Sequence, residues 1–426
     1  MSATAGPLIR LYPARALDLL HSLLPGIDVN DIWKCTDIFV LMSDLLEMIP
    51  LTDVSRQGSR GLSEEHCLLA GKTATFESFV VEFMNRCFTL IENSVRVNIR
   101  NDGGNTDEFL NDEEIAADAA INDTFLRMCV NSSPAIFAVI FSKLTCYLSG
   151  RIVEPTVAGG ILASMCKSLV QTDPAKGLAF FVPYLVRAVT ERVAERGDMA
   201  GEEGSVQDEE LQFTMQLLGE VLSVKNVSVY RSTGAHLLPY LEQICSVLEC
   251  TLALGQKDEY ELAHGVLSGA LSWLCHVRIL ETGPRIRPEL GCWGAMVGVE
   301  ELALTWYRPG QQEAAVVTSL LERFLTPVMT QLAKFGRGER VVEKEELQRN
   351  LKLVYRIVVG VSELAAPEQE AAWQSCLSSN LGWLEEVGLS LPGGGGVRAA
   401  ISALMCQVLG SRPVPRPCFC SRIVVL

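Results

Sequence analysis

The chain has 426 residues, an apolar fraction of 48% and a formal net charge of −15. This apolar content excludes a chain that is disordered throughout, because disordered chains lack the apolar surface needed to bury a core. The acidic balance excludes the basic face with which proteins hold duplex nucleic acid, so we expect no direct nucleic-acid partner.

The N-terminal sequence "MSATAGPLIRLYPAR" lacks the apolar core of a secretory signal, and residues 1–13 are expected to form a tail. The longest uncharged stretch, residues 262–277, contains His264 and His276, which argues against a membrane span. The cysteines show no paired spacing. Those in apolar helical runs are interpreted as buried and reduced, as in a protein of the nucleus and cytoplasm. They are Cys35, Cys87, Cys129, Cys146, Cys166, Cys245 and Cys275.

Apolar spacing predicts helices in series, and strand patterns are almost absent. The predicted helices cover 14–24, 30–48, 74–99, 112–130, 134–148, 155–171, 174–195, 207–224, 229–254, 257–280, 297–306, 310–334, 343–364, 368–387 and 397–409. Pro183, Pro239 and Pro327 are expected to interrupt three of them, while Asp173 and Pro174 mark a helix start.

The segment "TFESFVVEFMNRCFTLIENSVR" carries two apolar stripes on one helix. One stripe contains Phe76, Phe79, Val80, Phe83, Cys87, Leu90 and Ile91, and the other contains Val81, Met84, Phe88 and Val95. A surface helix needs one stripe, whereas a helix in a stacked array packs against its own partner and the next repeat. A central helix of a globular bundle would also carry two.

Paired helices recur at about 40–47 residues, the period of HEAT-type arrays. We therefore predict an all-α fold, an α-solenoid of HEAT-like antiparallel helix pairs over residues 14–390. Residues 391–426 are expected to form a Gly/Pro-interrupted C-terminal helix and tail.

Acidic charge is concentrated in two segments. Residues 101–118 hold seven acidic and no basic side chains, and residues 198–210 hold six acidic and no basic ones. Such segments are solvated loops or a docking surface for a basic partner. The candidate partner-facing residues are Asp102, Asp107, Glu108, Asp112, Glu113, Glu114, Glu202, Glu203, Asp208, Glu209 and Glu210.

Motifs for catalysis or cofactors are incomplete. Gly71-Lys72-Thr73 ends like a phosphate-binding loop, but His66 stands where that loop needs glycine, and we expect Lys72 just before a helix. Gly393–Gly396 reads as a linker. No two histidines have the spacing of a helical zinc site, and only a Cys–His pair formed across the fold stays open as a nucleophile. We predict no enzyme, cofactor or metal.

Five blocks resemble a family of very large single-chain HEAT-repeat proteasome activators, in its middle region. They are "LLPGIDVNDIWKCTDIFVLMSDLLEMIPLTDVS" (23–55), "TATFESFVVEFMNRCFTLIENSVR" (73–96), "GLAFFVPYLVRAVTERV" (177–193), "DEELQFTMQLLGEVLSV" (208–224) and "VEELALTWYRPGQQEAAVVTSLLERFLTPVMTQL" (299–332). Their order and spacing also resemble the family, over about residues 14–365.

The resemblance implies a non-catalytic activator. Its dome-like solenoid would cap the 20S proteasome core particle and promote degradation of peptides and unstructured proteins without ATP or ubiquitin. It also implies roles in DNA repair and in the turnover of acetylated histones, which would be basic partners.

The C-terminal sequence departs from the family pattern. It reads "SRPVPRPCFCSRIVVL", without the tyrosine of the family's activating tail, so we expect a truncated or altered end and a sticky or oligomeric fragment. No functional residue of the family transfers to a numbered position here. The alternative is another helical-repeat scaffold, such as a nuclear-transport-like carrier that binds a basic partner through the acidic loops.

Overall fold

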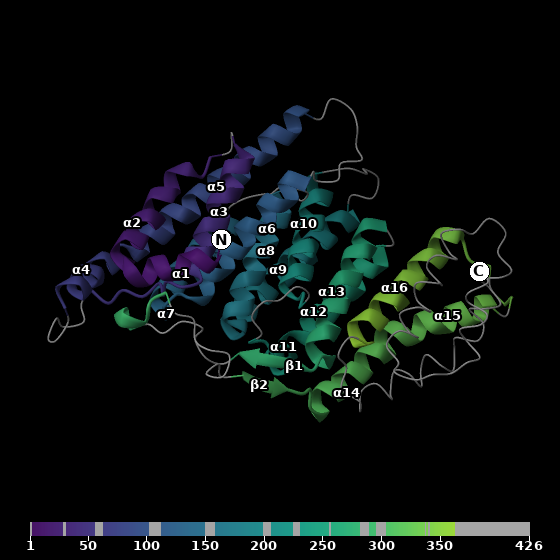
Figure 1. Ribbon diagram of the computed structural model, residues 1–426. Coiled ribbons are helices and arrows are strands. Elements are labelled where there is room, and N and C mark those ends of the chain that lie inside the picture. Colours follow the sequence, from purple (N-terminus) through teal and green to yellow (C-terminus); the bar gives the residue numbers. More distant parts are fainter. Residues whose placement is uncertain are drawn as a thin grey trace, which may run out of the picture. The chain divides into compact units, whose positions relative to one another are not determined.

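A computed structural model of the chain is helical almost throughout the part that it describes (Figure 1). The described residues are 2–28, 31–55, 63–101, 112–149, 158–198, 206–224, 231–254, 257–281, 289–294, 304–336, 338–339 and 341–362. They divide into two compact units. Unit 1 contains the described residues within 1–221, 226–232 and 279–305, and unit 2 contains the rest.

Unit 1 is built from ten α-helices among its described residues. They are α1 (Ser2–Leu11), α2 (Pro13–Leu23), α3 (Ile32–Leu46), α4 (Glu64–Thr73), α5 (Phe76–Asn101), α6 (Asp112–Val130), α7 (Pro134–Leu148), α8 (Ala158–Thr172), α9 (Pro174–Asp198) and α10 (Val206–Val221), with short turns η1 (Leu24–Gly26) and η3 (Leu290–Cys292).

Three of these helices, α5, α7 and α9, form one row and run in the same direction. Between α5 and α7, Lys143 Nζ lies 3.3 Å from Asn85 Oδ1, and Tyr147 Oη lies 3.1 Å from Glu92 Oε1. Between α7 and α9, the Lys176 ammonium lies 5.5 Å from the ring centre of Phe137. One turn later, the rings of Phe141 and Phe181 are 6.3 Å apart. Residue numbers rise together across each pair, so the helices are parallel.

A second row contains α3, α6, α8 and α10, which pack side by side (Figure 1). Phe39 of α3 contacts Thr124 of α6, and Glu47, directly after α3, contacts Arg127 of α6, so these two helices are parallel. Helices α6 and α8 are each antiparallel to the next helix in the sequence, since only short turns connect α6 to α7 and α8 to α9. The starts of α6, α8 and α10 recur at Asp112, Ala158 and Val206, close to the period of HEAT-type helix pairs. The predicted all-α fold of HEAT-like antiparallel helix pairs is therefore confirmed.

Helix α5 shows why two apolar stripes are needed in such an array. Phe76, Phe79 and Phe83 from the first stripe are at most 1% exposed, and Met84 from the second is fully buried. Phe88, also from the second stripe, stacks on Tyr147 of α7 with ring centres 3.9 Å apart. The second stripe therefore packs against the next helix of the row, as the sequence predicts.

Unit 2 repeats the parallel arrangement. Its helical elements are α11 (Gly234–Leu237), η2 (Leu238–Tyr240), α12 (Leu241–Leu254), α13 (Lys257–Cys275), α14 (Gln311–Leu320), the π-helical turn η5 (Leu321–Leu325), α15 (Thr326–Gly336) and α16 (Lys344–Ser362). Helices α13 and α16 pack along their lengths. The interruptions expected at Pro239 and Pro327 coincide with η2 and with the junction after η5, whereas Pro183 lies inside α9.

The two strands contradict the sequence prediction. Residues 304–306 were expected to end a helix but lie in β2 (Leu304–Tyr307), which pairs with β1 (Arg278–Glu281). The expected helix 257–280 ends at Cys275, because the Arg278 guanidinium donates to the carbonyl oxygens of Ser272 and Trp273, each at 2.8 Å. Residues 278–280 of that expected helix therefore lie in β1.

Three further expectations are wrong. The expected tail contains α1, held because Arg10 Nε donates to the carbonyl oxygen of Gly294 at 2.9 Å. Lys72 lies in the last turn of α4 rather than before a helix. Cys146 was expected to be buried but is exposed on the surface of α7. The other cysteines of the apolar runs are buried as predicted, namely Cys35, Cys87, Cys129, Cys166, Cys245 and Cys275. The expected helices 368–387 and 397–409, Gly393–Gly396 and the segment 391–426 lie outside the described residues.

One described stretch, Gly234–Leu254, is long and apolar enough to cross a membrane by length and composition. It comprises α11, η2 and α12, and its side chains Ile244, Val247 and Leu248 are at most 1% exposed within unit 2.

Candidate functional site

The rows of unit 1 place its longer connections at one edge. Helices α5, α7 and α9 end there, and α6, α8 and α10 begin there, joined through residues 102–111, 149–157 and 199–205. At the opposite edge, residues 131–133 join α6 to α7, and Asp173 alone joins α8 to α9. We call the first edge the long-connection edge.

Both acidic segments predicted from the sequence belong to the long-connection edge. Asp112, Glu113 and Glu114 form the first turn of α6, and Asp208, Glu209 and Glu210 lie in the first turns of α10. The starts of α6 and α10 therefore belong to the same edge, with α8 packed between these two helices. Carboxylates are also favoured at helix N-termini, where backbone N–H groups are unpaired. Asp102, Asp107, Glu108, Glu202 and Glu203 lie outside the described residues.

The α10 acids differ in their availability. Glu209 is exposed. Glu210 Oε1, by contrast, accepts a hydrogen bond from Arg192 Nη2 of α9 at 2.6 Å. Arg192 also donates to Glu195 Oε2 at 2.8 Å, and these hydrogen bonds, that of Glu195 first, raise the pKa of the Arg192 guanidinium. Glu210 therefore holds the α9–α10 pair together, and Glu209 is the better candidate for partner contact.

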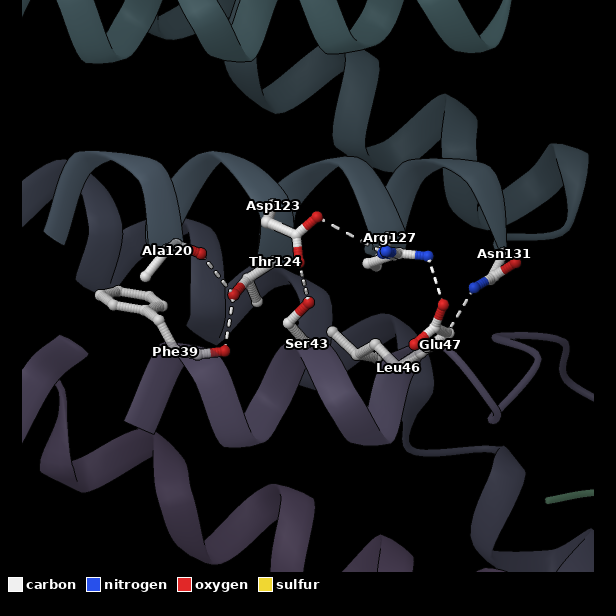
Figure 2. Close-up of polar contacts among 9 residues, drawn as sticks. All are labelled: Phe39, Ser43, Leu46, Glu47, Ala120, Asp123, Thr124, Arg127 and Asn131. Carbon is white, nitrogen blue, oxygen red and sulfur yellow. Dashed lines mark hydrogen bonds and ion pairs between the residues drawn. The ribbon is translucent and has the colours of Figure 1, made fainter. Parts of the chain in front are cut away.

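A polar seam between α3 and α6 holds these two helices together (Figure 2). Thr124 Oγ1 donates to the carbonyl oxygens of Phe39 and Ala120 at 2.8 and 2.7 Å. The Ser43 hydroxyl donates to the Asp123 carboxylate.

The seam continues towards the opposite edge. Arg127 Nη1 lies 2.7 Å from Glu47 Oε1, and Arg127 Nε lies 3.4 Å from Asp123 Oδ1 (Figure 2). Asn131 Nδ2 donates to the carbonyl oxygen of Leu46 at 2.8 Å. Directional bonds of this kind specify one register, whereas apolar packing alone tolerates sliding. The seam therefore fixes the position of α6 along α3.

Unit 2 contains a half-buried polar cluster that sequence reasoning missed. Tyr307 Oη donates to Glu313 Oε1 at 3.0 Å and accepts from the Gly234 N–H at 2.8 Å. Glu313 Oε2 accepts from the Gly310 N–H at 3.0 Å. Burial, together with the hydrogen bond to Glu313, raises the pKa of Tyr307 to about 12. The cluster fastens the start of α14 to α11, and "WYRPGQQE" within the family-like block 299–332 is its sequence signature.

Three features of the described residues bear on metal binding, nucleophilic chemistry and phosphate binding. No group of three or more His, Cys, Asp or Glu side chains there is placed to hold a metal ion. Burial raises the pKa of the Cys129 and Cys166 thiols, which makes them poor nucleophiles. Lys72, from the motif that resembles a phosphate loop, pairs with the Asp18 carboxylate and donates to the carbonyl oxygen of Ala14 at 3.1 Å.

Comparison with known proteins identifies similar sequences. A family model described as "Proteasome activator complex subunit 4, mid HEAT repeats region" matches residues 59–365. Proteasome activator complex subunit 4B of Danio rerio is 31% identical over 370 residues, covering 83% of this chain and 19% of that protein. Proteasome activator complex subunit 4 of Homo sapiens and of Bos taurus are each 30% identical over 366 residues, with the same coverage. The chain spans about a fifth of the length of these relatives.

Proposed function

Because the chain belongs to the family of proteasome activator complex subunit 4 and matches its mid HEAT-repeat region, we propose that it acts as a non-catalytic helical segment of a proteasome activator. The observation that carries this proposal is the family match over residues 59–365. The parallel rows of unit 1 support it, since stacked helix pairs present extended surfaces suited to a large protein partner.

In this proposal the segment contributes to a dome that caps the 20S core particle. The dome promotes degradation of peptides and unstructured proteins without ATP or ubiquitin, in the nucleus and cytoplasm. Its family-level roles are acetylated-histone turnover and DNA repair.

The long-connection edge of unit 1 is the surface proposed to meet basic proteins such as histones. Asp112, Glu113 and Glu114 are the first residues of α6, and Asp208 and Glu209 belong to the first turn of α10. Two acidic segments at one edge raise the local concentration of cationic partners more than either does alone. Binding of this kind weakens as salt increases.

The test is a native density gradient of cell extract, blotted with an antibody raised against residues 75–96. The expected result is a signal that co-migrates with 20S core particles. In a purified system, adding the full chain to core particles should increase hydrolysis of a fluorogenic peptide in the absence of ATP.

A 46.6 kDa band that runs free of core particles, with no change in peptide hydrolysis, would contradict the proposal. In that case a nuclear-transport-like carrier becomes the better hypothesis, and binding to a small GTPase would distinguish it. A chain with amides at the acidic positions of the long-connection edge serves as control. It should still co-migrate with core particles while losing affinity for basic proteins.

A further inference from the structure

The start of α9 places a lysine against two aromatic rings of α7. The Lys176 ammonium lies over the Phe141 ring, 4.5 Å from its centre, and it lies 5.5 Å from the centre of the Phe137 ring. Within the part of the chain that the structure describes, this ammonium makes no hydrogen bond or ion pair. A cation within about 6 Å of a ring centre is attracted by the negative face of the ring. The two rings are therefore what holds the Lys176 ammonium in place.

A third ring stands beside these two. Phe180 of α9 lies edge to face with Phe141, with ring centres 5.7 Å apart and planes at 81°. Phe180 follows Lys176 by four residues, the spacing that places side chains one above the other on a helix. The planes of Phe137 and Phe141 also differ, by 55°. Rings in three different planes beside one cation resemble the aromatic cages that hold quaternary ammonium groups. We call Phe137, Phe141 and Phe180 the aromatic cluster.

The aromatic cluster is covered by a side chain that can move. Phe137 and Phe141 are 6% and 7% exposed, but Lys176, which lies over the Phe141 ring, is itself exposed. On α7 the exposed neighbours of Phe141 are Ala138 and Ser142, whose side chains are too short to cover the ring. Because the four-carbon stem of lysine is flexible, Lys176 can turn into water without breaking a hydrogen bond. A ligand from solvent then reaches the face of the Phe141 ring.

The position of Lys176 indicates that the cluster attracts cations. Lys176 lies in the first turn of α9, where unpaired backbone N–H groups make a positive charge unfavourable. An exposed lysine would reduce this repulsion by extending into water, yet its ammonium lies on the rings of α7. The attraction of the ring faces therefore offsets the repulsion at the helix start.

We propose that the aromatic cluster binds the trimethylammonium group of a methylated lysine from a partner protein, with Lys176 as the intramolecular competitor. An unmodified lysine of a partner gains little by replacing Lys176, because it offers the same group and is not tethered to the site. Trimethylation keeps the positive charge and adds apolar surface, so the ring faces hold the modified group more strongly. The inference does not depend on the proposed function, since neither the acidic segments nor the core particle take part in the site.

Fluorescence anisotropy with the full chain tests the proposal. The probe is a labelled pentapeptide with trimethyllysine between alanines, and the comparison peptides carry unmodified lysine or a neutral tert-butyl group in place of the trimethylammonium. Lys176→Ala removes the competitor and should strengthen binding of the trimethyllysine peptide about tenfold. That variant should also prefer this peptide about tenfold over either comparison peptide. The two charged peptides carry the same charge, so general attraction to the acidic chain cancels between them.

Matched variants locate the site. In the Lys176→Ala chain, Phe141→Leu should weaken binding of the trimethyllysine peptide about tenfold. Phe88→Leu, which also removes one ring of an aromatic pair, should leave this binding unchanged. Lys143→Ala is the control for Lys176→Ala, because the Lys143 ammonium contacts Asn85 rather than a ring. It should not strengthen binding of the trimethyllysine peptide.

Three results would overturn the proposal at different levels. Equal binding of the trimethyllysine and tert-butyl peptides overturns recognition of a cation. Equal binding of the trimethyllysine and unmodified peptides overturns the assignment to a methylated lysine. Absence of binding of the trimethyllysine peptide to the Lys176→Ala chain overturns the site itself, and this result requires only a surface substitution, so it does not depend on the folding of a ring variant.

Discussion

A neutral histidine inside unit 2 makes the stability of that unit sensitive to acid. Burial is the main cause of its low pKa, followed by the charges of Arg356 and Lys352, so His264 has a pKa of about 3 in the folded chain and an ordinary value of 6.5 when unfolded. Between these values only the unfolded chain takes up the proton. The contribution of neutral His264 to the free energy of unfolding is therefore complete above pH 6.5 and is lost as pH falls towards 3.

We therefore predict that His264→Phe reduces the acid sensitivity of folding. Between pH 7 and pH 5 the unmodified chain should lose about 2 kcal/mol more stability than the variant, since each pH unit below the unfolded pKa costs about 1.4 kcal/mol. Phenylalanine keeps a ring against Tyr260 and removes the titrating nitrogen. Urea unfolding followed by circular dichroism at the two pH values measures the difference, and equal losses in both chains would contradict it.

Single residues also show what sequence patterns predict. Periodicity identified the buried face of α5 because burial there repeats with the helix. It could not separate Cys146, which is exposed, from Cys129, which is buried, because both lie in apolar runs. Nor could it show that Glu210 is engaged by Arg192, since that contact depends on the α9–α10 packing.

At the scale of elements, the α3–α6 seam joins helices whose sequences are far apart. Its ion pair is partly shielded, because the Arg127 and Glu47 side chains are 22% and 19% exposed. Pairs in such positions contribute more than exposed pairs, and leaving one carboxylate without its partner adds a further cost.

Arg127→Met should destabilise unit 1 by about 2 kcal/mol, because it leaves Glu47 and Asp123 without their cation. Adding Glu47→Gln should recover about 1 kcal/mol, which a double-mutant cycle from urea unfolding detects. The matched control is Arg187→Met, whose pair with Glu191 is 71% and 65% exposed, and it should change stability by less than about 0.5 kcal/mol. Equal effects of the two arginine variants would argue against a special role for the seam.

The α8–α9 turn depends on one glycine. A Cβ atom on Gly177 would come within 2.8 Å of Cα and Cγ2 of Val170, so Gly177→Ala should cost about 1–3 kcal/mol. A Cβ on Gly71 in α4 meets no atom within 4 Å, and Gly71→Ala should stabilise by about 0.5–1 kcal/mol. Thermal unfolding of the two variants should therefore shift in opposite directions, and shifts of the same sign would contradict the packing described for this turn.

Helices with an apolar pattern that extends over many residues were predicted correctly. Short elements were missed, because their structure depends on tertiary contacts. Helices α5, α6, α7 and α16 match the predicted ranges closely. Helix α4 was missed because it is short and buries only Leu69, Ala70 and Thr73, and β2 was missed because four residues carry too little pattern.

At the scale of the whole molecule, the family and its helical-repeat fold were predictable because their sequence blocks recur in order. The candidate edge was only partly predictable. The sequence shows two acidic segments, but that α6 and α10 begin at the same edge follows from the parallel rows, which no local pattern contains.

Replacing the acids of the long-connection edge should weaken binding of core histones. The variant carries amides at Asp112, Glu113, Glu114, Asp208 and Glu209, and Glu210 is kept because it pairs with Arg192. Affinity measured by fluorescence anisotropy should fall at least tenfold, with a shallower dependence on salt.

The matched control removes the same number of carboxylates elsewhere in the chain, at exposed positions. It carries amides at Asp37, Glu77, Glu322, Glu343 and Glu345. Equal loss of affinity in the two variants would mean that net charge, rather than this edge, governs binding of basic proteins.

The asymmetry between the two edges of unit 1 also bears on how this part of the chain can change over evolution. At the edge where residues 131–133 and Asp173 close the turns, an inserted residue would displace a whole helix along its row. At the other edge, the connections near residues 102–111 and 199–205 can lengthen without altering the helices that they join. Differences in length between homologues should therefore accumulate at that one edge, and the same positions suit the insertion of an epitope or a fluorescent domain.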